Sequence, residues 1–172
     1  MKKLYRVVVY IVDLIEVHIN AIIFITLFLS MLSQIFMRYV LNKPSPLLHE
    51  VTMYTFVWTV YLSAALAHRY DSHIKFNILY DKFPRKVQLI IDLIFDIFVS
   101  ILFVIALPPV INQLKMYSFI KSQITEIPWT YLFMVFPIFM ILVLIHNARR
   151  IYLEFLELFK GIPPVKEEKS WD

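Results

Sequence analysis

The chain has 172 residues, of which 60% are hydrophobic and 17% are charged, and its formal net charge is +4. A composition this hydrophobic is typical of membrane proteins, and if several stretches span a membrane, a chain of this length has little sequence left for a soluble domain. It contains no cysteine, which excludes disulfides, thiolate metal sites and cysteine catalysis. We therefore expect the function to reside in the bilayer or in short loops.

Four stretches of the chain lack Asp, Glu, Lys and Arg, and they cover residues 17–37, 51–68, 97–114 and 127–148. Each is close to the ~20 residues that a helix needs to cross ~30 Å of hydrocarbon. Stretches this apolar must be helical in lipid, because every backbone N–H and C=O needs a partner within the protein. The sequence predicts an all-α membrane protein with four transmembrane helices, at about 17–40, 50–68, 90–114 and 127–148.

Lys and Arg are distributed unequally over the segments outside these spans. The N-terminus, the second loop and the C-terminus together hold 13 of them, and the first and third loops hold 4. Cytoplasmic segments of membrane proteins carry the excess of Lys and Arg. We therefore expect both termini in the cytoplasm, and this topology explains the net charge without a nucleic-acid partner.

The predicted organisation is one four-helix membrane domain over residues 1–160, followed by a cytoplasmic tail over 161–172. Within the domain, residues 149–160 place apolar side chains on one stripe and predict an amphipathic cytoplasmic helix. Pro108 and Pro109 remove two successive backbone donors, so we expect a bend near the end of the third helix. Pro137 predicts a similar bend in the fourth.

Two pairs of acidic residues lie near predicted spans. Asp92 and Asp96 are four residues apart on one helical face, and acids in a span are candidates for proton or ion binding. The charge-free stretch begins only at Ile97, which favours a structural role at the cytoplasmic end of a long helix. There the two acids would pair with Lys82, Arg85 or Lys86 or face a partner subunit. Asp13 and Glu16 precede the first charge-free stretch, where an interfacial position is expected.

Histidines at similar levels of two predicted spans raise the alternative of haem binding. His18 and His146 would both lie at the cytoplasmic level, on the first and fourth helices. A haem needs two such imidazoles on facing helices. Both residues also lie at span ends, where a polar side chain is solvated and needs no cofactor, so we expect no cofactor in this chain.

Polar and aromatic residues mark the predicted side opposite the cytoplasm. Arg38 and Glu50 flank the first turn, and residues so close to hydrocarbon are accommodated best as pairs, with each other or with another chain. Trp58 lies two turns deeper in the second span. Trp129 follows Pro128 at the start of the fourth span, the position of an interfacial aromatic anchor.

These residues carry a family resemblance. Their order is Arg38 and Tyr39 ending the first span, Pro44 in the turn, Glu50 opening the second span and Trp58 within it, then His73 with Ile74, and later Trp129 and Pro137. The pattern resembles the small membrane subunit, of DctQ type, of tripartite ATP-independent periplasmic (TRAP) transporters. Where many members have Trp and paired acids before the second span, this chain has Leu47, Leu48, His49 and Glu50.

The resemblance implies a subunit of a bacterial inner-membrane transporter and no enzymatic activity. It implies two protein partners, a large multi-span membrane subunit that binds Na⁺ and moves as an elevator, and a periplasmic solute-binding protein. The solute would be an organic acid such as sialic acid or a C4-dicarboxylate, and this chain would be the scaffold. The motif makes Arg38, Tyr39, Pro44, Glu50, Trp58, His73 and Trp129 candidates for partner contacts or structural roles. Asp92 and Asp96 join them as acids near a predicted span.

Two alternatives from other classes remain open on the sequence alone. Small four-helix proteins with histidines also serve as haem or quinone anchor subunits of respiratory enzymes. A small exporter working as a homodimer through Glu16 or Asp92 is the second. The single glycine of the chain, Gly161, argues against independent substrate conduction, because broken helices that build transporter sites are often interrupted by glycine.

Overall fold

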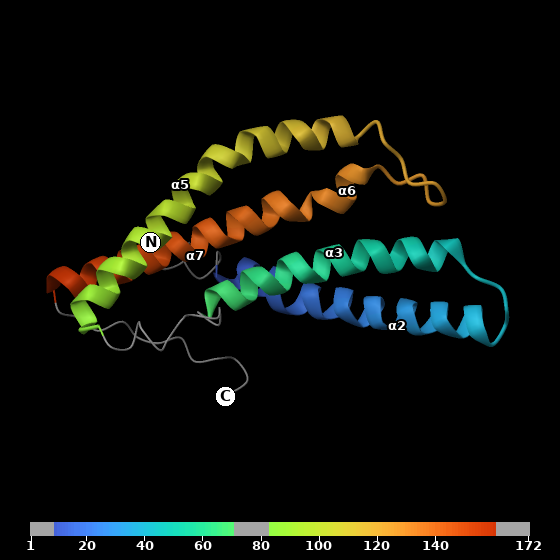
Figure 1. Ribbon diagram of the computed structural model, residues 1–172, viewed down its shortest axis with the longest axis horizontal. Coiled ribbons are helices and arrows are strands. Elements are labelled where there is room, and N and C mark those ends of the chain that lie inside the picture. Colours follow the sequence, from blue (N-terminus) through green and yellow to red (C-terminus); the bar gives the residue numbers. More distant parts are fainter. Residues whose placement is uncertain (1–8, 71–82, 161–172) are drawn as a thin grey trace. The chain divides into compact units, whose positions relative to one another are not determined.

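The computed structural model describes residues 9–70 and 83–160, with residues 1–8, 71–82 and 161–172 outside the description (Figure 1). The described residues form helices and no strand, which confirms the all-α prediction. In chain order the helices are η1 (Leu14–Ile19), α2 (Asn20–Tyr39), α3 (Pro46–Arg69), α5 (Arg85–Tyr117), α6 (Trp129–Phe133) and α7 (Val135–Lys160). The element η1 is a six-residue π-helix that runs directly into α2.

Three helical stretches among the described residues are long and apolar enough to cross a membrane, and they are Val9–Tyr39, Arg85–Tyr117 and Trp129–Leu158. Helix α3 has 24 residues, a length of ~36 Å. It is less apolar than the others because it carries Tyr54, Trp58, Tyr61 and several threonines. That α3 is a fourth span therefore stays a prediction, as does the location of the termini.

The turn between α2 and α3 is short and well determined by local chemistry. Asn42 adopts a positive φ of 50°, a conformation that asparagine tolerates better than most residues. Ser45 acts as the N-cap of α3, since its hydroxyl accepts from the Leu48 N–H at 3.4 Å. Pro46 is the first residue of the helix, where a missing N–H leaves no hydrogen bond unmade. The predicted proline turn is thus confirmed.

Helices α2 and α3 run antiparallel (Figure 1). They are joined by three polar side-chain pairs. Asn20 Nδ2 donates to Ser63 Oγ at 3.0 Å, and the hydroxyls of Ser30 and Thr52 share a hydrogen bond of 3.0 Å. Gln34 Nε2 donates to His49 Nδ1 at 3.3 Å. As the position advances along α2, its partner moves back along α3 by nearly the same number of residues. We call these pairs the polar ladder.

The α2 members of the ladder lie on a narrow stripe at spacings of three and four residues. Only six residues of helix α2 are not exposed, and they are Asn20, Ile23, Leu27, Ser30, Gln34 and Met37. The rest of α2 is an apolar surface with large exposed side chains such as Ile22, Phe28, Leu32, Phe36 and Tyr39. Association of helices in lipid gains nothing from the hydrophobic effect, so polar pairs and close packing hold them together.

The described chain divides into two compact units. The first comprises Met1–Leu66 and Pro109–Phe139, and the second comprises Ala67–Pro108 and Met140–Asp172. Helix α5 continues without interruption through Pro108 and Pro109, and the division between the units falls between these two prolines. The bend predicted at this position stays a prediction.

The last membrane stretch is interrupted once, at Met134, between α6 and α7. The Met134 N–H closes the last turn of α6 on Thr130 O at 2.8 Å. Pro137 then lies in the first turn of α7, where its missing N–H is tolerated. The irregularity predicted for Pro137 therefore takes the form of a new helix start just before it. The predicted amphipathic helix over 149–160 is continuous with α7, which ends at Lys160.

The polar ladder generates a stability prediction. Ser30→Ala removes a buried inter-helix hydrogen bond and is expected to destabilise the protein by about 1 kcal/mol, the scale of such bonds in membrane proteins. Thr26→Ala is the matched control, because the exposed Thr26 hydroxyl donates only to Ile22 O of its own helix. Equilibrium unfolding in mixed micelles measures both variants. Equal effects of the two substitutions would contradict a role for the ladder.

Candidate functional site

In the first unit, the carboxylate of Glu50 holds the loop between α5 and α6, residues 118–128. Glu50 Oε1 accepts from the Ile124 N–H at 2.9 Å, and Oε2 accepts from the Thr125 N–H at 3.1 Å and the Thr125 hydroxyl at 2.8 Å. The Ser122 side chain is a further hydrogen-bond partner of this carboxylate. One ionised group of α3 thus satisfies four donors of a loop more than 70 residues away in sequence.

The loop itself is closed by backbone hydrogen bonds. Ser122 N donates to Ile127 O at 3.0 Å, and Trp129 N donates to Ile120 O at 2.9 Å, so the two ends of the loop pair with each other. Glu126 turns the chain with a positive φ of 53°. The segment presents its Ile124 and Thr125 N–H groups to Glu50, as an anion-binding turn does.

These donors lower the pKa of Glu50. The hydrogen bond from Ser122 and those from Thr125 and Ile124 favour the ionised carboxylate and hold its pKa at about 2, below the ordinary value of 4.5. Glu50 lies just ahead of the charge-free stretch 51–68, outside the apolar part of α3. The carboxylate is therefore anionic at any physiological pH.

Two aromatic side chains continue the contact along the same face of α3. Tyr54 Oη donates to Ile127 O at 3.4 Å, and Trp58 Nε1 donates to Tyr131 O at 3.0 Å. Glu50, Tyr54 and Trp58 are spaced by four residues, so they lie in one row. We call these three residues with segment 122–131 the Glu50 clamp. At 100° per residue, its row lies nearly opposite the α3 face that carries the polar ladder.

Aromatic packing extends the Glu50 clamp one turn further. The ring of Tyr61 lies 5.4 Å from that of Phe136 and 5.6 Å from that of Phe139, both on α7. On the other side of the loop, Tyr117 of α5 and Trp129 of α6 both contact the ring of Phe133, at 4.9 and 6.3 Å. Edge and tilted contacts of this kind stabilise by about 1 kcal/mol each beyond their buried area.

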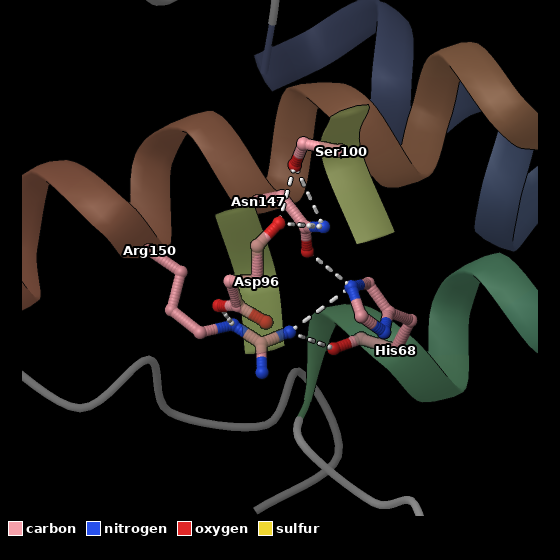
Figure 2. A network of polar contacts seen from close by, with 5 residues as sticks. All are labelled: His68, Asp96, Ser100, Asn147 and Arg150. Carbon is pink, nitrogen blue, oxygen red and sulfur yellow. Dashed lines mark hydrogen bonds and ion pairs between the residues drawn. The ribbon is translucent and has the colours of Figure 1, made fainter. Parts of the chain in front are cut away.

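The second unit contains a different polar assembly, which joins α3, α5 and α7 (Figure 2). Arg150 Nε forms an ion pair with Asp96 Oδ2 at 3.1 Å. The same guanidinium donates through Nη2 to the backbone carbonyl of His68 at 3.2 Å, at the end of α3. Arg150 therefore connects the acid of α5 with the C-terminal turn of α3, where carbonyls have no helical partner.

Asn147 completes this assembly one turn before Arg150. Its Nδ2 lies 3.2 Å from Ser100 Oγ and 3.4 Å from Asp96 O, while Oδ1 lies 2.5 Å from His68 Nε2. Nε2 can donate to Asn147 or accept from Arg150, but it cannot do both. The short contact to Asn147 favours the tautomer that donates. We call His68, Asp96, Ser100, Asn147 and Arg150 the Asp96 network.

The Asp96 network is buried, which makes its pairing energetically important. Asp96 is 2% exposed and Asn147 is fully buried. A buried ion pair is weak evidence of net stability, but removal of one partner leaves an uncompensated charge at a large energetic cost. Arg85 and Glu157 form a second, more exposed pair in this unit, with bidentate contacts of 2.8 and 2.9 Å. No metal-binding cluster of His, Asp and Glu occurs among the described residues.

The family model for "Tripartite ATP-independent periplasmic transporters, DctQ component" matches residues 27–157, which include all of the Glu50 clamp and all of the Asp96 network. The chain belongs to this DctQ family. A curated relative from Haemophilus influenzae, named "Putative TRAP transporter small permease protein", is 27% identical over 101 residues. That alignment covers 59% of this chain and 60% of the relative's length.

Membership of the DctQ family confirms the resemblance found in the sequence. The family is described as one component of tripartite transporters. Three of the motif residues that carried the resemblance belong to the Glu50 clamp. Glu50 and Trp58 belong to the Glu50 clamp, and Trp129 closes its loop through its backbone N–H and packs on Phe133.

The other candidate residues of this DctQ chain are not part of the Glu50 clamp. Arg38 and Tyr39 lie exposed at the end of α2, where the guanidinium stands 5.8 Å from the Tyr39 ring centre. Pro44 lies in the turn, and the oxygens of Glu50 bond the loop rather than Arg38. Asp96 pairs with Arg150, whereas Arg85, one of its expected partners, pairs with Glu157. Asp92 is half-buried one turn earlier on α5, and His73 lies outside the described residues.

Most of the remaining contacts involve side chains that the charge pattern of the sequence does not mark. Asn20, Ser30 and Asn147 are uncharged, so they do not interrupt the stretches free of Asp, Glu, Lys and Arg. Amides and hydroxyls inside an apolar helix are the signal that would have found them, because such groups need partners in lipid. Glu16 was expected near the interface, yet it is fully buried in the π-helix η1.

The lowered pKa of Glu50 predicts a pH dependence. Because its pKa is about 2 in the folded protein and 4.5 otherwise, Glu50 contributes stability in full above pH 4.5. This contribution is lost as the pH falls from 4.5 toward 2. Glu50→Gln should therefore have a lower melting temperature than the parent at pH 6, with the difference shrinking below pH 4.5. A difference that stays constant down to pH 3 would contradict the assignment.

The Asp96 network predicts strong coupling between two helices. Asp96→Asn and Arg150→Leu each leave one buried polar partner uncompensated, so each is expected to destabilise by about 3 kcal/mol. The double variant should lose less free energy of unfolding than the two single variants lose together. Unfolding experiments in a double-mutant cycle would measure this difference. Arg150→Lys is the intermediate case, because lysine keeps the charge but not the planar fork. Simple additivity would show that the two residues are independent.

Proposed function

We propose that this chain is the small membrane subunit of a Na⁺-coupled TRAP transporter. In this role it scaffolds the large, elevator-type membrane subunit and helps to dock the periplasmic solute-binding protein. The match of residues 27–157 to the DctQ family carries the proposal. Na⁺ and solute bind to the other components, and this chain contributes no cofactor.

The surface of α2 supports the scaffold role. Helix α2 uses a single stripe for its contact with α3, and its remaining surface consists of exposed apolar side chains, among them Phe24, Phe28 and Ile35. A surface of this kind can pack against helices of a large membrane protein, with lipid covering what the partner leaves free. The internal ladder keeps the hairpin rigid while a neighbouring body moves.

The arrangement of the first unit supports a docking role. The Glu50 clamp fixes the α5–α6 loop to the beginning of α3, directly after the α2–α3 turn. Arg38 stands exposed at the end of α2, and the only partner described for it is the neighbouring ring of Tyr39. In our proposal the α2–α3 turn and the charged side of this loop, with Lys121 and Glu126, face the periplasm. Both termini are cytoplasmic, and α3 is the fourth span of an inner-membrane protein. Arg38 is then available to an acidic group of the binding protein.

The solute in this proposal is an organic acid, either sialic acid or a C4-dicarboxylate. The relative from Haemophilus influenzae is named only as a small permease protein, so its name supports the transporter class rather than the solute. Specificity would reside in the binding protein and the large subunit. Most buried polar side chains of the described residues have internal partners, among them Ser30, Asp96 and Asn147. This is in keeping with a scaffold that does not contact the solute.

Charge reversal at Arg38 tests the proposal. Arg38→Glu should reduce Na⁺-driven uptake in cells or vesicles about tenfold, equivalent to ~1.4 kcal/mol of docking free energy. Lys86→Glu is the matched control, since Lys86 is an exposed cation at the start of α5. Affinity purification in mild detergent from the native membrane should recover a many-span protein with the parent chain and with both variants. Recovery of a homodimer alone, or a Soret band in the purified sample, would overturn the proposed function.

A further inference from the structure

The α5–α6 loop exposes large apolar side chains in spite of its rigid attachment. Phe119 is 89% exposed, the highest value among the exposed large hydrophobic residues of the described chain. Ile120, Ile124 and Ile127 are exposed in the same loop, and Met116 is exposed just before it. A loop that faced only water would be expected to carry polar side chains at these positions, so the apolar surface needs a partner.

Many backbone N–H groups of this loop have hydrogen-bond partners within the chain. The N–H groups of Ser118, Phe119 and Ile120 donate to the carbonyls three residues before them, in the last turn of α5. Those of Ser122 and Trp129 close the loop on itself, and those of Ile124 and Thr125 bind Glu50. Where water is scarce, each unpaired N–H costs several kcal/mol. At these positions the loop meets this requirement with its own atoms and one carboxylate.

The position of the loop in the chain places it at a membrane boundary. It starts where the candidate span Arg85–Tyr117 ends, and it finishes where the candidate span Trp129–Leu158 begins. Lys115, Lys121 and Trp129 accompany it, and Lys and Trp are residue types that settle at the level of lipid headgroups. The exposed apolar side chains of the loop are therefore continuous in sequence with two lipid-crossing helices.

We propose that the α5–α6 loop is a membrane-inserted wedge. Phe119 and Ile120 enter the boundary between lipid headgroups and acyl chains, while the Glu50 clamp keeps the loop backbone satisfied and fixed in orientation. The partner of this apolar surface is thus the bilayer itself. The inference rests on the loop and its hydrogen bonds and is independent of the transporter assignment. It leaves Lys121 and Glu126, the charged residues of the loop, on its aqueous side.

The absence of cysteine from the chain allows a direct test with single labels. Phe119→Cys and Ile120→Cys would each carry a nitroxide, in the full chain with its co-purifying partners in lipid nanodiscs. The control labels are Lys43→Cys in the exposed α2–α3 turn and Phe28→Cys on the exposed apolar surface of α2. Collisions with oxygen report lipid, and collisions with a water-soluble nickel chelate report solvent.

The wedge predicts a high ratio of oxygen to nickel collisions at residues 119 and 120, well above that at residue 43 and close to that at residue 28. Use of two loop positions protects the test if one substitution disturbs folding. A ratio at both positions equal to that at residue 43 would overturn the proposal, because the loop would then lie in water. Shielding from both reagents that disappears when partners are removed would also overturn it, because a protein would then cover the loop.

Discussion

The structure depends on one constraint, which is that polar groups placed in or near lipid must find partners inside the protein. The Glu50 carboxylate meets this constraint most fully. It serves two backbone N–H groups and two hydroxyls of a distant loop, and those donors in turn keep it ionised. The polar ladder and the Asp96 network follow the same rule at other levels of the chain. The polar residues of the ladder, of the Glu50 clamp and of the Asp96 network act as connections between segments of the chain.

Helix α3 has a central position in the first unit because it carries polar contacts on two nearly opposite faces. One face holds α2 through the ladder, and the other holds the α5–α6 loop and α6 through the Glu50 clamp. This explains why α3 is less apolar than the other long helices. Thr52, Tyr54 and Trp58 serve as hydrogen-bond partners for neighbouring segments, so the hydropathy that would mark α3 as a lipid-facing span is reduced.

The sequence alone predicts the all-helical fold class and much of the family motif. The length of an apolar stretch and the turn made by a proline are local properties, so they can be read without knowledge of the fold. Glu50 and Trp58 both belong to the family motif, but the sequence does not show which segment of the chain they contact. Residues 122–131 reach them only after the chain has passed through α5, and no periodicity reports a contact over that separation. Arg150 was counted as one of many cytoplasmic cations, because its role depends on Asp96 of another helix. The side-chain amide of Asn147 was missed for the same reason.

The polar ladder also has a consequence for the order in which the protein assembles. Its pairs join residues of α2 and α3, which leave the ribosome one after the other and are separated by a turn of a few residues. The hairpin can therefore satisfy these groups as soon as α3 is made. Glu50 has to wait until residue 125 is synthesised, and Asp96 until residue 150. The N-terminal hairpin is thus suited to enter the membrane as a unit, with the later helices added against its free α3 face.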